Sequence, residues 1–222
     1  MKAISLKWAM VPLAVVLAGA ASSTTVLAQD PSSSPSGSSA SSTPAVKPDP
    51  SVAQRKENQQ DRIANGVQSG QLTAGETSKL ETKEAAINGE TRADRAANGG
   101  KLTAGEKAKI NGQQNHLSNQ IYTDKHNANT AQYGNNKVGQ RRENQQDRVA
   151  QGIKSGQLTA GETAKVENQQ KGINQQVAAD RKANGGSLTA SEKTQVNHEQ
   201  NQASKNIYRK KHNASTQASP KL

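Results

Sequence analysis

The sequence predicts an all-α protein: two tandem three-helix units that follow a signal peptide and a disordered linker. Residues 54–128 and 140–214 are close copies of each other. Four Gly-x-Leu-Thr-x-x-Glu elements recur within these copies, and each has the spacing of a helix start. Apolar residues recur at helical intervals, and no strand-like alternation is present. Fixed periods of this kind are typical of helical-repeat proteins.

Residues 1–28 have the features of a secretory signal peptide. Lys2 and Lys7 supply positive charge, residues 8–20 are apolar but too few to cross a bilayer, and residues 26–28 form a cleavage signal. We therefore expect cleavage after Ala28 and export to the periplasm or the exterior of a bacterium. The chain contains no cysteine, so we expect neither disulfides nor a lipoprotein anchor. No later segment predicts a transmembrane helix.

Three segments lack the helical pattern. Residues 29–52 are rich in serine and proline and cannot bury enough apolar surface to offset the loss of chain entropy. We expect them to form a disordered linker, and we favour an inert spacer over a tether. Residues 129–138 contain glycine and several asparagines and predict a second linker. Residues 215–222 predict a disordered tail.

Each copy is expected to form one helical repeat unit, over residues 53–128 and 139–214. Apolar positions that differ between the copies mostly exchange one aliphatic side chain for another, as a core of constant volume and polarity requires. The predicted helices cover about residues 53–66, 74–97, 104–127, 139–152, 160–183 and 190–213.

The repeated Gly-x-Leu-Thr-x-x-Glu element has the spacing of a capping box. The threonine hydroxyl can accept from the backbone N–H three residues later, and the glutamate there can reach back to the threonine N–H. The glycine can adopt the positive φ that ends the preceding helix. We interpret the element as a helix stop, a turn and a helix start rather than a binding site. The pairs are Thr73 with Glu76, Thr103 with Glu106, Thr159 with Glu162, and Thr189 with Glu192.

Large apolar side chains are few, and their stripes are thin. We expect each unit to bury its own stripes and fold independently, with one stacked solenoid as the alternative. So thin a core could also be completed by an oligomer or a partner. Runs such as Asn-Gln-Gln are interpreted as polar helix surface, with an interhelical amide ladder or an assembly surface as the alternative.

The sequence contains no recognisable catalytic or cofactor motif. It lacks Gly-x-Ser-x-Gly, P-loop and His-Glu-x-x-His patterns and any metal-ligand spacing, so we predict no enzymatic activity and no cofactor. Two Tyr-x-x-x-His pairs each lie on one helical face: Tyr122 with His126, and Tyr208 with His212. We interpret the tyrosines as packing residues and the histidines as favourable charges near a helix C-terminus. A metal or anion site at these pairs is the alternative.

The formal net charge of +11 favours an anionic partner. Few aromatic side chains are available to stack on bases, and the chain carries an export signal, so we expect no specific nucleic-acid binding. Basic residues are interspersed with acidic ones, and much of the charge is therefore expected on a solvated face. An anionic component of the cell envelope or a protein client is the partner class that remains.

The segments RRENQQDRVAQGIKSGQLTAGE, NGGKLTAGEKAKIN and IYRKKHN resemble a group of small exported bacterial proteins of unassigned function. This resemblance covers residues 54–214 and implies bacterial export and helical structure. The Leu-Thr segments are also similar, more faintly, to those of small periplasmic stress chaperones of the Spy/CpxP kind. The repeated element further resembles the end of an EF-hand loop, with Gly100 and Glu106 matching its glycine and its last ligand. Non-acidic residues stand at its first three ligand positions, namely Arg95, Ala97 and Gly99.

We therefore expect an exported, non-enzymatic helical-repeat protein that acts by surface interaction in the cell envelope or outside it. A periplasmic chaperone-like binder of unfolded clients is the first alternative. A degenerate EF-hand-like module that responds to metal is the second.

Overall fold

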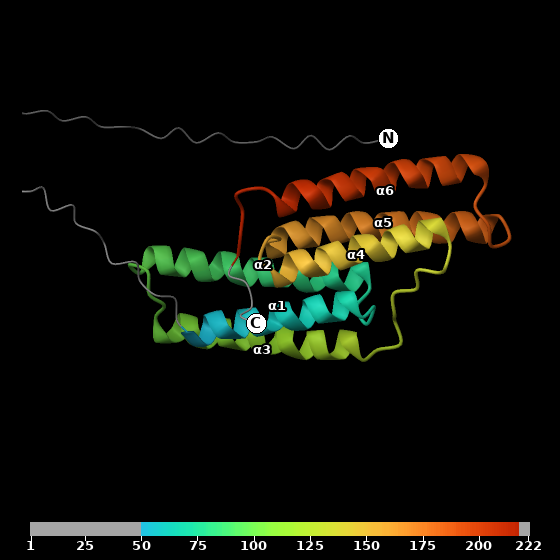
Figure 1. Ribbon diagram of the computed structural model, residues 1–222. Helices are drawn as coiled ribbons and strands as arrows, with labels where there is room; N and C mark the ends of the chain where they lie inside the picture. The colour runs from blue at the N-terminus through green and yellow to red at the C-terminus, as the bar shows by residue number, and fades with distance from the viewer. Residues whose placement is uncertain (1–49, 218–222) are drawn as a thin grey trace, which may run out of the picture. The chain divides into compact units, whose positions relative to one another are not determined.

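The computed structural model describes residues 50–217, and this part of the chain folds into six α-helices without a strand (Figure 1). The predicted signal peptide and most of the predicted first linker lie outside the described residues. The helices are α1 (Pro50–Gln68), α2 (Ala74–Ala97), α3 (Ala104–Lys125), α4 (Lys137–Lys154), α5 (Ala160–Ala183) and α6 (Ala190–Lys211). The prediction of an all-α fold is confirmed, and the helices follow the expected tandem three-helix order.

Two helices begin earlier than the sequence predicts. α1 begins at Pro50, within the segment predicted as the first linker, and α4 begins at Lys137, within the second. Proline suits a first helical position, because an N–H there would lack an intrahelical partner in any case. The Asn136 side chain caps α4 by accepting from the Gly139 N–H at 3.1 Å.

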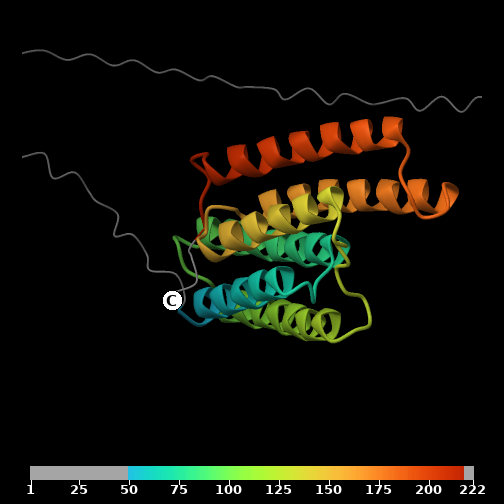
Figure 2. The same cartoon turned by 45° about the vertical axis from the view of Figure 1, so that its right-hand side comes forward.

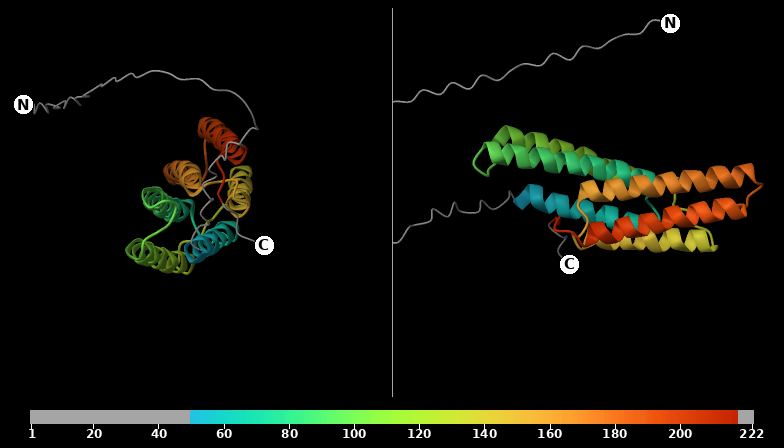
Figure 3. Two further views of the ribbon diagram at one scale, coloured as in Figure 1. Left: turned by 90° about the vertical axis from the view of Figure 1, so that its left-hand side faces the viewer. Right: turned by 90° about the horizontal axis from the view of Figure 1, so that it is seen from above.

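The helices stack in four layers (Figures 2 and 3). α3 forms one outer layer and contacts only α1 and α2, while α6 forms the opposite outer layer and contacts only α4 and α5. Between them, α2 packs along α5 and α1 packs along α4. The two copies therefore meet through their first two helices, and the third helix of each copy faces outward.

The two copies are related to each other as the subunits of a two-fold dimer are. Ser78 Oγ on α2 donates to the carbonyl of Ala164 on α5 at 3.0 Å, and these two positions are equivalent in the repeat. Likewise, a Cβ at Gly75 would lie 3.5 Å from Lys171, and a Cβ at Gly161 would lie 3.9 Å from Ala85. The second contact repeats the first with the copies exchanged. Such reciprocal contacts define an isologous interface in which α2 and α5 run antiparallel.

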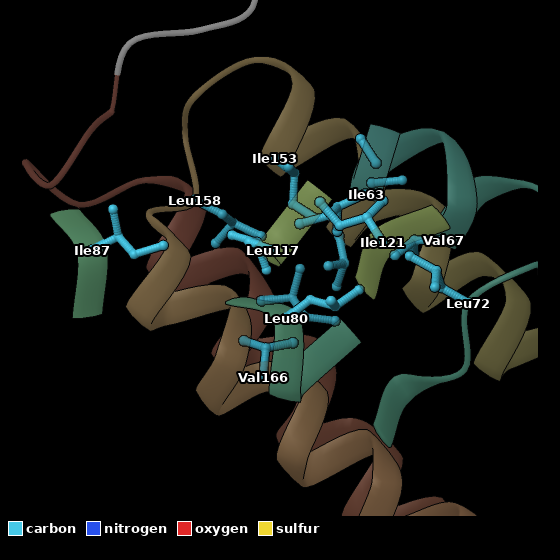
Figure 4. Packing of buried hydrophobic residues seen from close by; sticks show 14 of the residues in the cluster. Ile63, Val67, Leu72, Leu80, Ile87, Leu117, Ile121, Ile153, Leu158 and Val166 are labelled. Atoms are coloured by element: carbon cyan, nitrogen blue, oxygen red, sulfur yellow. The ribbon is translucent and has the colours of Figure 1, made fainter. Parts of the chain in front are cut away.

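One hydrophobic cluster spans both copies (Figure 4). It includes Leu80 on α2 and the equivalent Val166 on α5, both of which are almost completely buried. The expectation that each unit buries its own stripes is therefore wrong for this cluster, in which the thin stripe of one copy is covered by the other. A second, smaller cluster lies within the second copy and comprises Val138, Ile173, Val177, Leu188, Val196 and Ala203.

Glutamine side chains complete the core between the helices. Gln59 Nε2 on α1 donates to the Gln114 carbonyl at 2.6 Å and to Ser118 Oγ at 2.8 Å, and Gln114 Nε2 on α3 donates to the Val52 carbonyl at 3.0 Å. The second copy repeats this arrangement. The interpretation of these glutamines as polar surface is wrong. They form hydrogen bonds between helices instead, as the alternative interpretation proposed. Hydrogen bonding of the amide nitrogens offsets part of the cost of burying these side chains, although the Oε1 atoms of Gln59, Gln114 and Gln200 have no partner.

Candidate functional site

All four capping boxes are present in the structure. The Thr73 N–H donates to Glu76 Oε2 at 3.0 Å, and the Glu76 N–H donates back to Thr73 Oγ1 at 3.3 Å. The same reciprocal bonds start α3, α5 and α6. Gly70 and Gly156, with φ of 71° and 70°, end the helices before α2 and α5. The repeated element therefore has the architecture that its spacing predicts.

The Lys-His-Asn segments have an architectural role that the sequence did not reveal. Asn127, just after α3, donates from Nδ2 to Glu76 Oε1 at 2.7 Å, and Asn213 donates to Glu162 Oε1 at 2.5 Å. In each repeat unit, this hydrogen bond joins the residue that follows the third helix to the capping glutamate at the start of the second helix. Burial acts to raise the pKa of Glu76, but hydrogen bonds from Thr73 and Asn127 hold this pKa below its usual value.

Replacing the N-cap threonine of α2 or α5 should destabilise the protein. We expect Thr73→Ala and Thr159→Ala each to lower the free energy of unfolding by about 1 kcal/mol, because the helix N-terminus loses an acceptor. Urea denaturation measures this loss. Thr82→Ala is the matched control, since Thr82 lies exposed within α2, where alanine is the better helix former. Unchanged stability of both cap variants would contradict the role assigned to the caps.

The Tyr–His pairs form two equivalent surface features. Tyr122 and Tyr208 are each 61% exposed, and their rings stack on His126 and His212 with centroids 4.2 and 4.1 Å apart. His126 Nδ1 lies 2.7 Å from the Tyr122 carbonyl oxygen, and the second pair repeats this contact at 2.8 Å. The histidines thus cap the C-termini of α3 and α6. The interpretation of the tyrosines as packing residues is wrong, because the neighbouring isoleucines alone fill the core.

The surroundings of the two tyrosines differ in charge. Tyr208, with Ser204, Lys205 and Arg209, lines an open hollow of about 480 Å³ on α6. We call these four residues the α6 surface. Asn119 and Thr123 stand at the equivalent positions of α3 in place of Lys205 and Arg209. The α6 surface therefore joins an exposed aromatic ring to two exposed cations, whereas its counterpart on α3 has the ring alone.

Three glutamates are buried where the two copies meet. Glu81 and Glu167 occupy equivalent positions on α2 and α5, and Glu84 lies one turn beyond Glu81. Gln60 Nε2 donates to Glu81 Oε2 and Gln146 Nε2 donates to Glu167 Oε2, each at 3.1 Å. The second oxygen of each of these two carboxyls has no hydrogen-bond partner.

Burial strongly perturbs these carboxyls. It raises the pKa of Glu81 to about 8, with further repulsion from Glu84 and Glu167. It also raises the pKa of Glu167 to about 8 and that of Glu84 to about 7. This cluster was not predicted from the sequence. A signal was present: Glu84 lies four residues after Leu80 and three before Ile87, and Glu81 lies three residues before Glu84, so Glu84 shares a helical face with the apolar residues and with Glu81.

The fold and these surfaces define the protein as an all-helical tandem-repeat protein. Comparison with protein-family models, with curated proteins and with solved structures found no match to the chain. Within residues 50–217, no group of three or more histidine, cysteine or acidic residues is placed to hold a metal ion. No helix of this described part is long and apolar enough to cross a membrane.

Proposed function

We propose that this protein is an exported, non-enzymatic binding protein that engages an acidic polysaccharide of the cell envelope through the α6 surface. The observation that carries the proposal is the exposed Tyr208 ring beside the exposed cations of Lys205 and Arg209. The flat face of a sugar ring can pack on the tyrosine while its acidic substituents pair with the cations.

The Tyr208 ring is held ready for such a contact. It stacks on His212, whose Nδ1 lies 2.8 Å from the Tyr208 carbonyl oxygen, and the preceding Ile207 is fully buried. A side chain that is already ordered loses less conformational entropy when a ligand binds. This favours binding at Tyr208 over binding at a mobile surface residue.

The apolar stripes give less support to a chaperone-like role. They lie in the core, and among the described residues only Tyr122 and Tyr208 are large apolar side chains with high exposure. An unfolded client would therefore find little apolar surface on the folded protein.

The equivalent surface of α3, formed by Ser118, Asn119, Tyr122 and Thr123, provides a matched control for the test. Calorimetry at low salt should detect binding of alginate, an acidic polysaccharide, and no binding of neutral dextran. We expect Tyr208→Ala to weaken alginate binding by about tenfold, a loss of about 1.4 kcal/mol, and Tyr122→Ala to leave it nearly unchanged. The triple variant Lys205→Asn, Arg209→Thr, Lys210→Asp gives α6 the residues of α3 and should abolish the dependence of binding on salt.

Equal effects of Tyr122→Ala and Tyr208→Ala would refute the assignment to α6, and equal binding of dextran would refute an acidic ligand. Circular dichroism checks that each variant is folded. If the wild-type protein does not bind alginate but suppresses aggregation of an unfolded client, the result would support the chaperone-like alternative instead.

A further inference from the structure

The segments that follow α3 and α6 take the same path over the other helices of their own copy. The Ala131 N–H donates to the Gly70 carbonyl at 2.8 Å, and the Gln217 N–H donates to the Gly156 carbonyl at 3.0 Å. Ala131 and Gln217 are therefore equivalent in the repeat, although residues 215–217 belong to the segment predicted as a disordered tail. The two positions differ in one respect: one carries a methyl group and the other a carboxamide.

The Gln217 carboxamide joins the two copies. Its Nε2 donates to Gln60 Oε1 on α1 at 2.7 Å, and its Oε1 accepts from the Ala160 N–H, the first residue of α5, at 3.2 Å. Both the donor and the acceptor of a primary carboxamide are used. The site therefore matches the hydrogen-bonding chemistry of this group.

The equivalent site beside Ala131 lacks such a side chain. Gln146, the counterpart of Gln60, is only 4% exposed and its Oε1 has no hydrogen-bond partner. Ala74, the counterpart of Ala160, is the first residue of α2. Ala74, Ala131 and Gln146 all line a cavity of about 370 Å³. The groups that hold the carboxamide at one site thus face a cavity at the other.

Other polar atoms at this cavity also lack partners. Tyr133 Oη, Arg142 Nε and Asn174 Oδ1 have none, and all three residues line the cavity. The Arg142 guanidinium lies 5.5 Å from the centre of the Tyr133 ring. No acidic side chain is among the lining residues. Buried polar atoms without partners are costly, so a ligand that supplies both a donor and an acceptor gains affinity here.

Glycine keeps the linker close to α4 beside this cavity. A Cβ at Gly139 would lie 1.9 Å from the Tyr133 carbonyl oxygen, and the equivalent position in the first copy is Ala53. Glycine at position 139 therefore permits the close approach of the linker, and Tyr133 lies in the cavity wall.

We propose that this cavity is a binding site for a primary carboxamide, either free glutamine or a glutaminyl residue of a peptide. The ligand N–H donates to Gln146 Oε1, and the ligand oxygen accepts from the N-terminus of α2, as the Gln217 side chain does at the equivalent site. The cavity shares no residue with the α6 surface, so this site does not depend on polysaccharide binding.

Titration calorimetry of the full chain tests the proposal with three probes. The first is L-glutamine, and the second is a peptide with the sequence of residues 215–219, acetylated at its N-terminus and N-methylated at its C-terminal amide. The third is L-glutamate, which has the same shape without the amide donor. We expect one site per chain for glutamine, the peptide or both, and at least about tenfold weaker binding of glutamate. Whichever of the first two probes binds identifies the source of the carboxamide.

Two variants make the test specific. Ala131→Gln gives the linker the residue that the tail has, so it should fill the cavity, abolish binding and raise the melting temperature. Gln217→Ala should open the equivalent site and raise the stoichiometry from one to two. A melting temperature of Ala131→Gln at or above that of the wild type shows that a loss of binding does not come from unfolding. Wild-type affinity in Ala131→Gln, equal binding of glutamate, or no saturable binding of either carboxamide to the wild type would overturn the proposal.

Discussion

The protein is expected to be much more stable in mild acid than in mild alkali. Burial raises the pKa values of Glu81 and Glu167 to about 8 and that of Glu84 to about 7, from a usual value of 4.5. Between these values the folded protein keeps protons that the unfolded chain has released. The stabilisation is therefore complete below about pH 4.5 and is lost as the pH rises through 7 to 8.

The helix-capping glutamates have the opposite dependence. The pKa values of Glu76 and Glu162 are lowered when the protein folds, so their contribution is present above the usual glutamate pKa and is lost as the pH falls. Lys56 also matters, because it faces Glu84 and burial lowers its pKa; its titration opposes that of the glutamates at alkaline pH. We expect maximal stability near about pH 5.

Scanning calorimetry at a series of pH values measures the effect. Each pKa unit corresponds to about 1.4 kcal/mol, so three carboxyls together contribute several kcal/mol. For a domain of this size the melting temperature should fall by more than about 10 °C between pH 5 and pH 8.5.

Glutamine substitutions distinguish the contribution of these carboxyls to the pH dependence from that of the other titratable groups. The double variant Glu81→Gln, Glu167→Gln should remove most of the dependence on pH and be more stable than the wild type at pH 8.5. Glu84→Gln is a milder variant, because α5 already has glutamine at this position, Gln170. Glu84→Gln should remove a smaller part of the dependence of stability on pH. If the melting temperature of the double variant changes with pH as steeply as that of the wild type, these carboxyls are not the source of the pH dependence.

Neither half of the protein is expected to fold alone as a monomer. Residues 50–134 and 135–217, expressed separately, would each expose the face of α2 or α5 that the other copy covers, including Leu80 or Val166. Far-ultraviolet circular dichroism at micromolar concentration should show little helix for each half. Mixing the halves should restore the helical signal at a one-to-one ratio.

Concentration is the control in this experiment. Because the interface is isologous, a second molecule of the same half can replace the missing copy, so the helical signal of one half should rise with its concentration. The signal of the intact chain should not change. A half that melts cooperatively at a temperature independent of concentration would contradict a shared core.

Local chemistry explains why much of the fold could be predicted. The starts of α2, α3, α5 and α6 depend on a threonine and a glutamate three residues apart, and both bonds of each capping box lie within four consecutive residues. The repeated apolar spacing likewise marks the helical faces. Such features act over one or two helical turns, so no knowledge of distant contacts is needed.

The candidate sites could not be predicted in the same way. Nothing near Glu81 in the chain shows that an equivalent glutamate, Glu167, packs beside its helix. The exposure of Tyr208 depends on the outer position of α6, and the role of Gln217 depends on Gln60, which is distant in the chain. Each of these facts follows from contacts between elements, not from the residues themselves.

The sequence by itself therefore determined the helical class, the starts of four helices and the duplication. Only the tertiary structure decided that the copies share one core, that glutamates and glutamines lie inside it, and that one carboxamide site is filled by Gln217 while its counterpart borders a cavity. The physical reason is one of range. Helix formation and capping depend on neighbours in the chain, whereas burial depends on what the second copy places against the first.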